Sequence, residues 1–74
     1  MTKREIENRL QGEVQKAVWS LIWSRKQMRS GEIAKKLGRG NSSVTNAIGR
    51  LIEIGGVVPV ERGLYAVAEG VTKC

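Results

Sequence analysis

The spacing of apolar residues changes once along this chain, and the change sets narrow bounds on the fold. Up to Ile54 apolar side chains recur every three or four residues, which predicts amphipathic helices. After Gly55-Gly56 the stretch VVPVERGLYAV is β-branched and aromatic on both sides of residues 61–63, which predicts two strands joined by a three-residue loop with Gly last. Pro59 cannot donate a ladder hydrogen bond, so it predicts an edge strand. The expected class is mainly α with a small β-hairpin.

Three helical segments are expected before the hairpin. The first spans about residues 3–23, and Gly12 inside it marks either a bend or a break into two helices. The part before the glycine, about residues 3–12, is an N-terminal extension. A short second helix begins with Ser30 as its N-cap and ends at Gly38, and a third runs from about residue 41 to residue 54.

All 74 residues are expected to form one domain, with residues 69–74 as a loose tail. The predicted core consists of the apolar stripes of the three helices and one connector residue: Ile6, Leu10, Val14, Ala17, Val18, Leu21, Ile22, Met28, Ile33, Ala34, Leu37, Val44, Ala47, Ile48 and Leu51. Trp19 and Trp23 stack on a different face of the first helix, since each residue turns about 100°. Three interpretations stay open for this pair: later segments cover it as a second part of the core, it forms a dimer interface, or it stacks on DNA.

Positive charge is concentrated in one segment. Residues 24–50 contain a single acid, Glu32, and the whole net charge of +6 resides there. The cations of this segment are Arg25, Lys26, Arg29, Lys35, Lys36, Arg39 and Arg50. No acid occurs from Ile33 to Ile52. A basic surface suits a polyanion or an acidic membrane, although it also serves simply to keep a protein soluble.

The composition argues against several classes of function. The chain has no His and no Asp, and its one cysteine is Cys74, so neither a zinc site nor an activated nucleophile is expected. We expect no enzyme activity, no cofactor and no small-molecule ligand. The first ten residues have no apolar run and no stretch approaches a membrane span of about 18 apolar residues, so we expect a cytoplasmic protein without a membrane partner.

The segment GRGNSSVTNAIGR, residues 38–50, is unusual for a helix because its polar residues are middling or poor helix formers. With the apolar stripe turned inward, one face of small amides and hydroxyls points outward. That face comprises Ser42, Ser43, Thr45, Asn46, Gly49 and Arg50. An ordinary soluble face near a helix cap would also contain such residues. The alternative is a reading surface, where bulky or acidic side chains would clash with bases or repel phosphates.

The segment SGEIAKKLGRGNSSVTNAIGRLIEIGGVV resembles the winged helix-turn-helix regulators of bacteria and their phages. In this resemblance residues 30–37 are similar to the first helix of the motif, Gly38 to its turn, and residues 41–54 to the recognition helix. The stretch Glu61-Arg62-Gly63 is similar to the tip of the wing. The resemblance covers about residues 13–68 and implies a three-helix core with a short wing.

The resemblance implies a sequence-specific regulator that binds double-stranded DNA, such as a small repressor or a phage or plasmid control protein. It assigns base contacts to Ser42, Ser43, Thr45, Asn46 and Arg50, and phosphate contacts to Ser30, Lys35, Lys36, Arg39 and Asn41. Arg62 would reach the minor groove. One domain reads only a half-site, so a homodimer is expected, with Leu10, Trp19 and Trp23 as candidate interface residues. The alternative is a winged-helix module that docks a protein through a Trp19/Trp23 patch.

Overall fold

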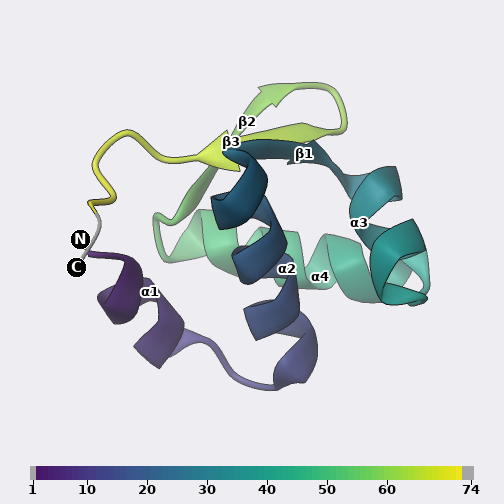
Figure 1. Ribbon diagram of the computed structural model, residues 1–74, viewed down its shortest axis with the longest axis horizontal. Helices are drawn as coiled ribbons and strands as arrows, with labels where there is room; N and C mark the ends of the chain where they lie inside the picture. The colour runs from purple at the N-terminus through teal and green to yellow at the C-terminus, as the bar shows by residue number, and fades with distance from the viewer. Residues whose placement is uncertain (1, 73–74) are drawn as a thin grey trace.

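Helices pack beneath a small sheet in the computed structural model, which describes residues 2–72 (Figure 1). The elements in chain order are α1 (Lys3–Arg9), α2 (Glu13–Arg25), β1 (Gln27–Arg29), α3 (Ser30–Leu37), α4 (Asn41–Glu53), β2 (Val57–Glu61) and β3 (Leu64–Val67). The described chain therefore contains four helices and a three-stranded antiparallel sheet, which confirms the mainly helical class with a hairpin. Cys74 lies outside the described residues.

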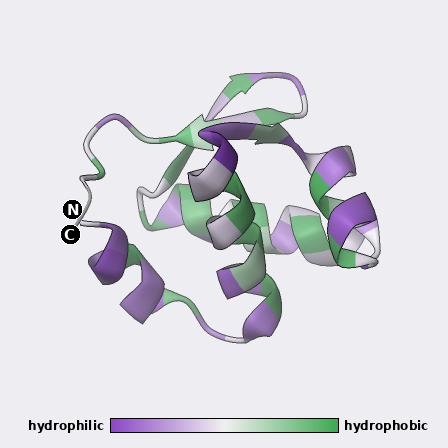
Figure 2. Cartoon of the chain, viewed as in Figure 1, coloured by the Kyte–Doolittle hydropathy of each residue, from purple (hydrophilic) through white to green (hydrophobic). Residues whose placement is uncertain are grey.

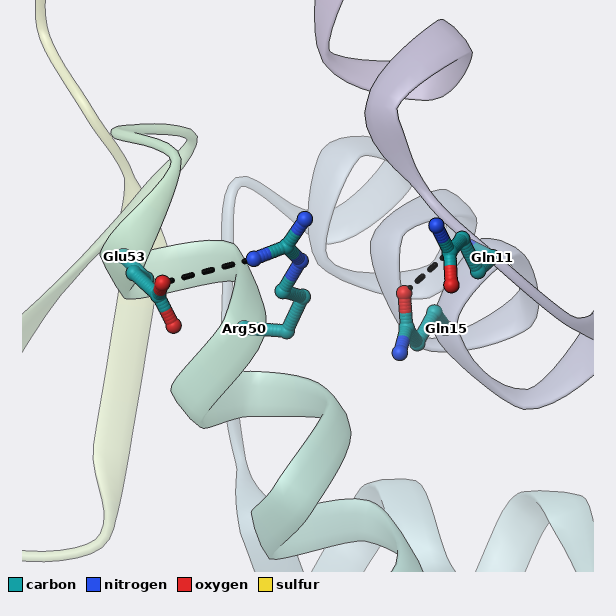
Figure 3. Close-up of polar contacts among 4 residues, drawn as sticks. All are labelled: Gln11, Gln15, Arg50 and Glu53. Carbon is teal, nitrogen blue, oxygen red and sulfur yellow. Dashed lines mark hydrogen bonds and ion pairs between the residues drawn. The ribbon is translucent and has the colours of Figure 1, made fainter.

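Gly12 separates two helices rather than bending one. It has a φ of 84°, which an L side chain adopts only with strain, and Leu10 leaves α1 in an extended conformation. In the segment between the two helices, the backbone N–H of Gln11 donates to Oε1 of Gln15 at 2.9 Å (Figure 3). Of the two outcomes that the sequence left open at this glycine, the break is the observed one.

Thr2 and Glu5 cap the start of α1 reciprocally. The Glu5 N–H donates to Oγ1 of Thr2 at 3.2 Å, and the Thr2 N–H donates to Oε1 of Glu5 at 3.0 Å. The backbone N–H of Thr2, followed by the Thr2 side chain, lowers the pKa of the Glu5 carboxyl. The carboxylate therefore stabilises α1 above the unfolded-state pKa, and this contribution is lost as the pH falls through the lower folded-state pKa.

We accordingly expect the cap to open only at a pH below the ordinary glutamate pKa of about 4.3. An NMR titration of the Thr2 and Glu5 amide signals measures this directly. In Glu5→Gln the same signals should not move over the acid range, since the amide does not titrate. A midpoint at or above the ordinary value in the unmodified protein would contradict the predicted cap.

The sheet has the strand order β1-β3-β2, and its central strand is the last one in the chain. Met28 pairs with Tyr65, and Pro59 pairs with Tyr65 from the other side. The sequence predicted a connector rather than a strand at residues 27–29, because three residues are too few for a periodic signal. Met28 is buried as predicted, and Pro59 lies on an edge strand as predicted.

The hairpin loop is one residue shorter than predicted. Glu61 pairs with Leu64, which leaves only Arg62 and Gly63 between the strands. The extra residue is absorbed inside β2, where the register shifts between Pro59 and Glu61. Gly63 has a φ of 78°, so the tight turn depends on a glycine at this position.

Helix α3 begins one residue earlier than expected. The N-cap is Arg29, with φ −84° and ψ 146°, and no side chain caps the helix, so the prediction of Ser30 as N-cap is wrong. The cause is the strand that the sequence did not reveal: Arg29 ends β1 in extended geometry and the helix starts at the next residue. The Ser30 N–H donates to the Gly63 carbonyl at 3.0 Å, which ties α3 to the hairpin turn.

The core lies between α2, α3, α4 and the inner face of the sheet. Thirteen hydrophobic residues of the described chain are buried: Ile6, Leu10, Val18, Trp19, Ile22, Met28, Ile33, Ala34, Val44, Ala47, Ile48, Leu51 and Val57. Most were predicted. Val14, Ala17, Leu21 and Leu37 are only partly buried. Val14 and Ala17 lie in the first turns of α2 and Leu37 ends α3, at the margin of this small core.

Trp19 and Leu10 belong to the core of the same chain, with 1% and 5% of their surface exposed. They are therefore not available to a second chain, and their assignment to a dimer interface is wrong. Both side chains lie in one buried cluster with Ile6 of α1, and Ile6 and Trp19 meet beside Gly56. Trp23 is half-buried, with its ring centroid 5.6 Å from that of Trp19. The exposed tryptophan pair that a docking module would need is not formed.

Two lysines lie over Trp23. The Nζ atoms of Lys3 and Lys26 are 5.7 Å and 5.0 Å from the ring centroid, within the range of cation–π attraction. Lys26 has a φ of 73° and is the only non-glycine residue with positive φ in the described part of the chain. Of the two, the Lys3 contact joins α1 to α2, whereas Lys26 directly follows α2.

The tail is attached over residues 68–72. Thr72 forms a parallel bridge with Thr2, and its carbonyl accepts from the Lys3 N–H at 2.8 Å. Val71 packs against the core. The loose tail predicted from residue 69 is therefore wrong for residues 69–72, because this segment returns to the start of α1 (Figure 1).

Gly56, which follows the end of α4, is closely approached by side chains from α1 and α2. A Cβ built there would lie 2.8 Å from Cδ1 of Ile6 and 3.3 Å from Cζ3 of Trp19. Both side chains are almost fully buried and have little room to move. We expect Gly56→Ala to lower the free energy of unfolding by about 1–3 kcal/mol, measured by chemical denaturation.

Gly49→Ala is the matched control for this prediction. A Cβ at Gly49 meets nothing within 4 Å, and the residue lies inside α4. The same substitution should there raise the free energy of unfolding by up to about 1 kcal/mol, because alanine has the higher helix propensity. Equal effects at the two glycines would rule out the close approach at Gly56.

Candidate functional site

Helix α4 has one buried face and one open face. Val44, Ala47, Ile48 and Leu51 are at most 2% exposed, as predicted. They pack against α2 and α3, which lie on the inner side of α4 (Figure 1). This packing holds a segment of weak helix formers in helical form, since short helices depend on tertiary contacts more than on propensity.

The opposite face of α4 is open to solvent over its first turns. Ser42, Ser43, Thr45 and Asn46 are exposed. Within residues 2–72, no hydrogen bond or ion pair occupies these four side chains. The predicted face is therefore accessible, and its hydroxyl and amide groups are free to bind another molecule.

Arg50 differs from its neighbours on this face. It is half-buried, and its Nη1 lies 3.3 Å from Oε1 of Glu53, which follows it by three residues on the same helix (Figure 3). The two side chains form an ion pair. The Arg50 side chain is 38% exposed and that of Glu53 is 71% exposed. The predicted base-contact residue is thus held beside a carboxylate on its own helix.

Glu53 is the member of this surface that the sequence analysis missed. The acid-free stretch ends at Ile52, and the helix continues for one residue beyond it. The spacing of three residues between Arg50 and Glu53 was the available signal, since such pairs are neighbours on a helix.

The N-terminus of α4 is left open for an anion. Its N-cap is Gly40, no side chain caps it, and its first turn contains no acid. The free N–H groups and the positive end of the helix dipole therefore point toward solvent. Asn41, the first residue of the helix, is exposed as well.

Three exposed cations precede this open helix end in the chain. Lys35, Lys36 and Arg39 are exposed on the last turn of α3 and on the turn that follows it. Figure 2 shows hydrophilic residues along this end of α3. In Figure 1, α3, the start of α4 and the β2–β3 turn gather at one end of the molecule, and both chain termini lie at the other end.

The remaining predicted site residues, Arg62 and Ser30, differ in their exposure to solvent. Arg62 is exposed on the β2–β3 turn, at the same end of the molecule as α3 (Figure 1). Ser30 is half-buried, and its N–H is already bound to Gly63. Nη2 of Arg29 lies 3.9 Å from Oε2 of Glu61, an exposed pair that contributes little to stability.

No group of three or more potential metal-ligating side chains occurs within residues 2–72. None of the helices there combines the length and the apolar character that crossing a membrane requires. A hollow between the start of α2 and the end of α3 is lined by Glu13, Val14, Ala17, Leu37 and Arg39.

Comparison with known proteins adds no assignment. No protein-family model matches the sequence, and neither the curated proteins nor the solved structures contain a match.

Proposed function

We propose that this chain is a sequence-specific regulator of the winged helix-turn-helix class that binds double-stranded DNA in the cytoplasm. A small repressor or a phage or plasmid control protein is the form we favour. In this proposal α3, the turn at residues 38–40 and α4 form the helix-turn-helix, and β2 and β3 form the wing. The order of these elements and the three-stranded antiparallel sheet are compatible with that fold.

The observation that carries the proposal is the open face of α4. The major groove of DNA admits a helix, and amide and hydroxyl groups there form hydrogen bonds with base edges. Asn46 has the chemistry to pair with adenine, and Ser42, Ser43 and Thr45 have the chemistry for mixed base and phosphate contacts. Within residues 2–72 none of these four side chains forms a hydrogen bond, so their own contacts with DNA would break none, whereas Arg50 would have to leave Glu53.

The charges around α4 support the same proposal. Lys35, Lys36 and Arg39 flank the open N-terminus of the helix, where they would meet phosphates on one side of the groove. Arg62 would reach the adjacent minor groove from the short wing. Such contacts position a protein on DNA without choosing the sequence.

We further propose a homodimer that binds a pseudo-palindromic site, because specific complexes bury about 1,000–2,500 Å² of protein surface. One face of a short helix falls short of that area. Leu10 and Trp19 are buried in their own chain, so they play no part in this interface. Ile52, Val58 and Val60 are the large hydrophobic residues that the described chain leaves exposed.

Selection of bound duplexes from a random DNA pool, followed by salt titration on the selected duplex, tests the proposed function. We expect an enriched sequence, nanomolar to micromolar affinity, a steep fall of log affinity with log salt, and two chains per duplex. Absence of duplex binding at low salt would refute the proposal.

Asn46→Ala is expected to weaken binding to the selected duplex by about 1–3 kcal/mol and to relax the preference at one base pair. Random DNA should be bound with nearly unchanged affinity, since a lost base contact affects only the correct site. The measurement is a fluorescence-anisotropy titration of both duplexes. Asn8→Ala removes another exposed amide, from α1, and should change neither affinity. An equal loss on both duplexes in Asn46→Ala would contradict the role in base reading.

A further inference from the structure

We propose that Glu53 determines the sequence selectivity of the α4 surface by restraining Arg50. Glu53 would have this role only if the proposed function holds, and its effect would be to weaken nonspecific binding to DNA. The basis for this role is the ion pair between Nη1 of Arg50 and Oε1 of Glu53 at 3.3 Å (Figure 3).

The position of Glu53 on α4 makes it part of the DNA-facing surface. At about 100° per residue, Ser42, Asn46 and Glu53 lie along one line opposite the buried stripe. With a rise of 1.5 Å per residue, Glu53 is about 10 Å from Asn46 along the helix axis. The major groove is about 12 Å wide, so a helix that places Asn46 over the bases brings Glu53 toward the phosphates at the groove edge.

The effect of the Glu53 carboxylate therefore depends on whether Arg50 contacts a phosphate or a guanine base. A phosphate carries a negative charge, and Glu53 repels it while competing for the same guanidinium. A guanine edge is neutral and accepts two hydrogen bonds from the arginine fork, so the nearby carboxylate adds little repulsion there. Contact with phosphates of arbitrary sequence is weakened more than contact with the correct base.

The ion pair is weak enough to be released. It is solvent-exposed, with 71% of the Glu53 side chain accessible, and exposed pairs of this spacing contribute little to stability. Arg50 can therefore leave Glu53 when a bidentate acceptor is present. A buried or multiply bonded pair would instead have kept Arg50 away from every target.

The test compares Glu53→Gln with the unmodified protein on the selected duplex and on random duplex DNA of equal length. We expect random DNA to be bound roughly 3- to 10-fold more tightly and the selected duplex less than about 2-fold more tightly. The ratio of the two affinities should fall accordingly. Glu69→Gln removes the same charge from the tail, and it should shift both affinities equally.

The Arg50→Ala background separates restraint of Arg50 from simple charge repulsion. There Glu53→Gln should change both affinities by the same factor, because no guanidinium remains to be restrained. A selective effect that persists without Arg50, equal tightening on both duplexes, or weaker binding to the selected duplex would each overturn the inference. If the unmodified protein binds no duplex, the proposed function fails instead, and the two failures are thus distinguishable.

Discussion

Replacing Lys35 and Lys36 together by alanine will weaken binding to duplex DNA by roughly 10- to 100-fold at about 0.15 M salt, irrespective of sequence. Without these two phosphate contacts, complex formation releases about two counterions fewer. The slope of log affinity against log salt should therefore become shallower by about two. Salt titrations of the selected duplex and of a random duplex measure both quantities. The two duplexes should lose affinity by the same factor, since phosphate contacts do not read sequence.

The matched control for this prediction is the double substitution Arg4→Ala/Arg9→Ala. It removes the same charge from exposed positions of α1, which lies at the opposite end of the molecule from α3 (Figure 1). We expect less than about a 3-fold loss, because these residues act only through the long-range field, which salt screens. Equal losses in the two double variants would show that net charge, and not the surface around α4, controls binding.

Leu51→Ala is expected to lower the free energy of unfolding by about 2–5 kcal/mol. Leu51 is fully buried on the inner stripe of α4, and the truncated side chain would leave a cavity in a core of few residues. Urea denaturation followed by tryptophan fluorescence measures the loss, since Trp19 is buried in the same core. Duplex affinity should fall only to the extent that the folded fraction falls.

Ile52→Ala provides the control on the adjacent residue. Ile52 is 39% exposed and is not part of the buried cluster, so its truncation should change the free energy of unfolding by less than about 1 kcal/mol. The pair of variants tests the orientation of α4 directly. Comparable losses at both positions would mean that the helix is rotated and that the face with Asn46 is not the open one.

Hydrophobic spacing was sufficient to predict the helices at residues 30–37 and 41–53 and the inner stripe of α4. These segments are short and bounded by Gly38, Gly40 and Gly55, and their burial follows from local periodicity. The exposed polar face of α4 follows from the same pattern. That part of the candidate site was predictable because it depends on one helix and on which side of it is apolar.

Long-range contacts decided the features that were predicted wrongly. The strand at residues 27–29 exists because β3, far along the chain, pairs with it, and it displaces the N-cap of α3 from Ser30 to Arg29. Leu10 and Trp19 are buried because they join Ile6 of α1 in one hydrophobic cluster, in which Ile6 and Trp19 approach Gly56 closely. The partner of a strand or of an isolated apolar face is not encoded in local spacing.

Within the candidate site too, local sequence pattern predicted some features and tertiary packing decided others. Periodicity, composition and the distribution of Lys and Arg along the chain were enough to specify a helix with one apolar face, one polar face and cations before it. The packing of the whole chain decided which surfaces stay open: it left Asn46 free, paired Arg50 with Glu53 and enclosed Trp19. Local pattern determines what each helix has to bury, whereas only the assembled core determines what is left uncovered.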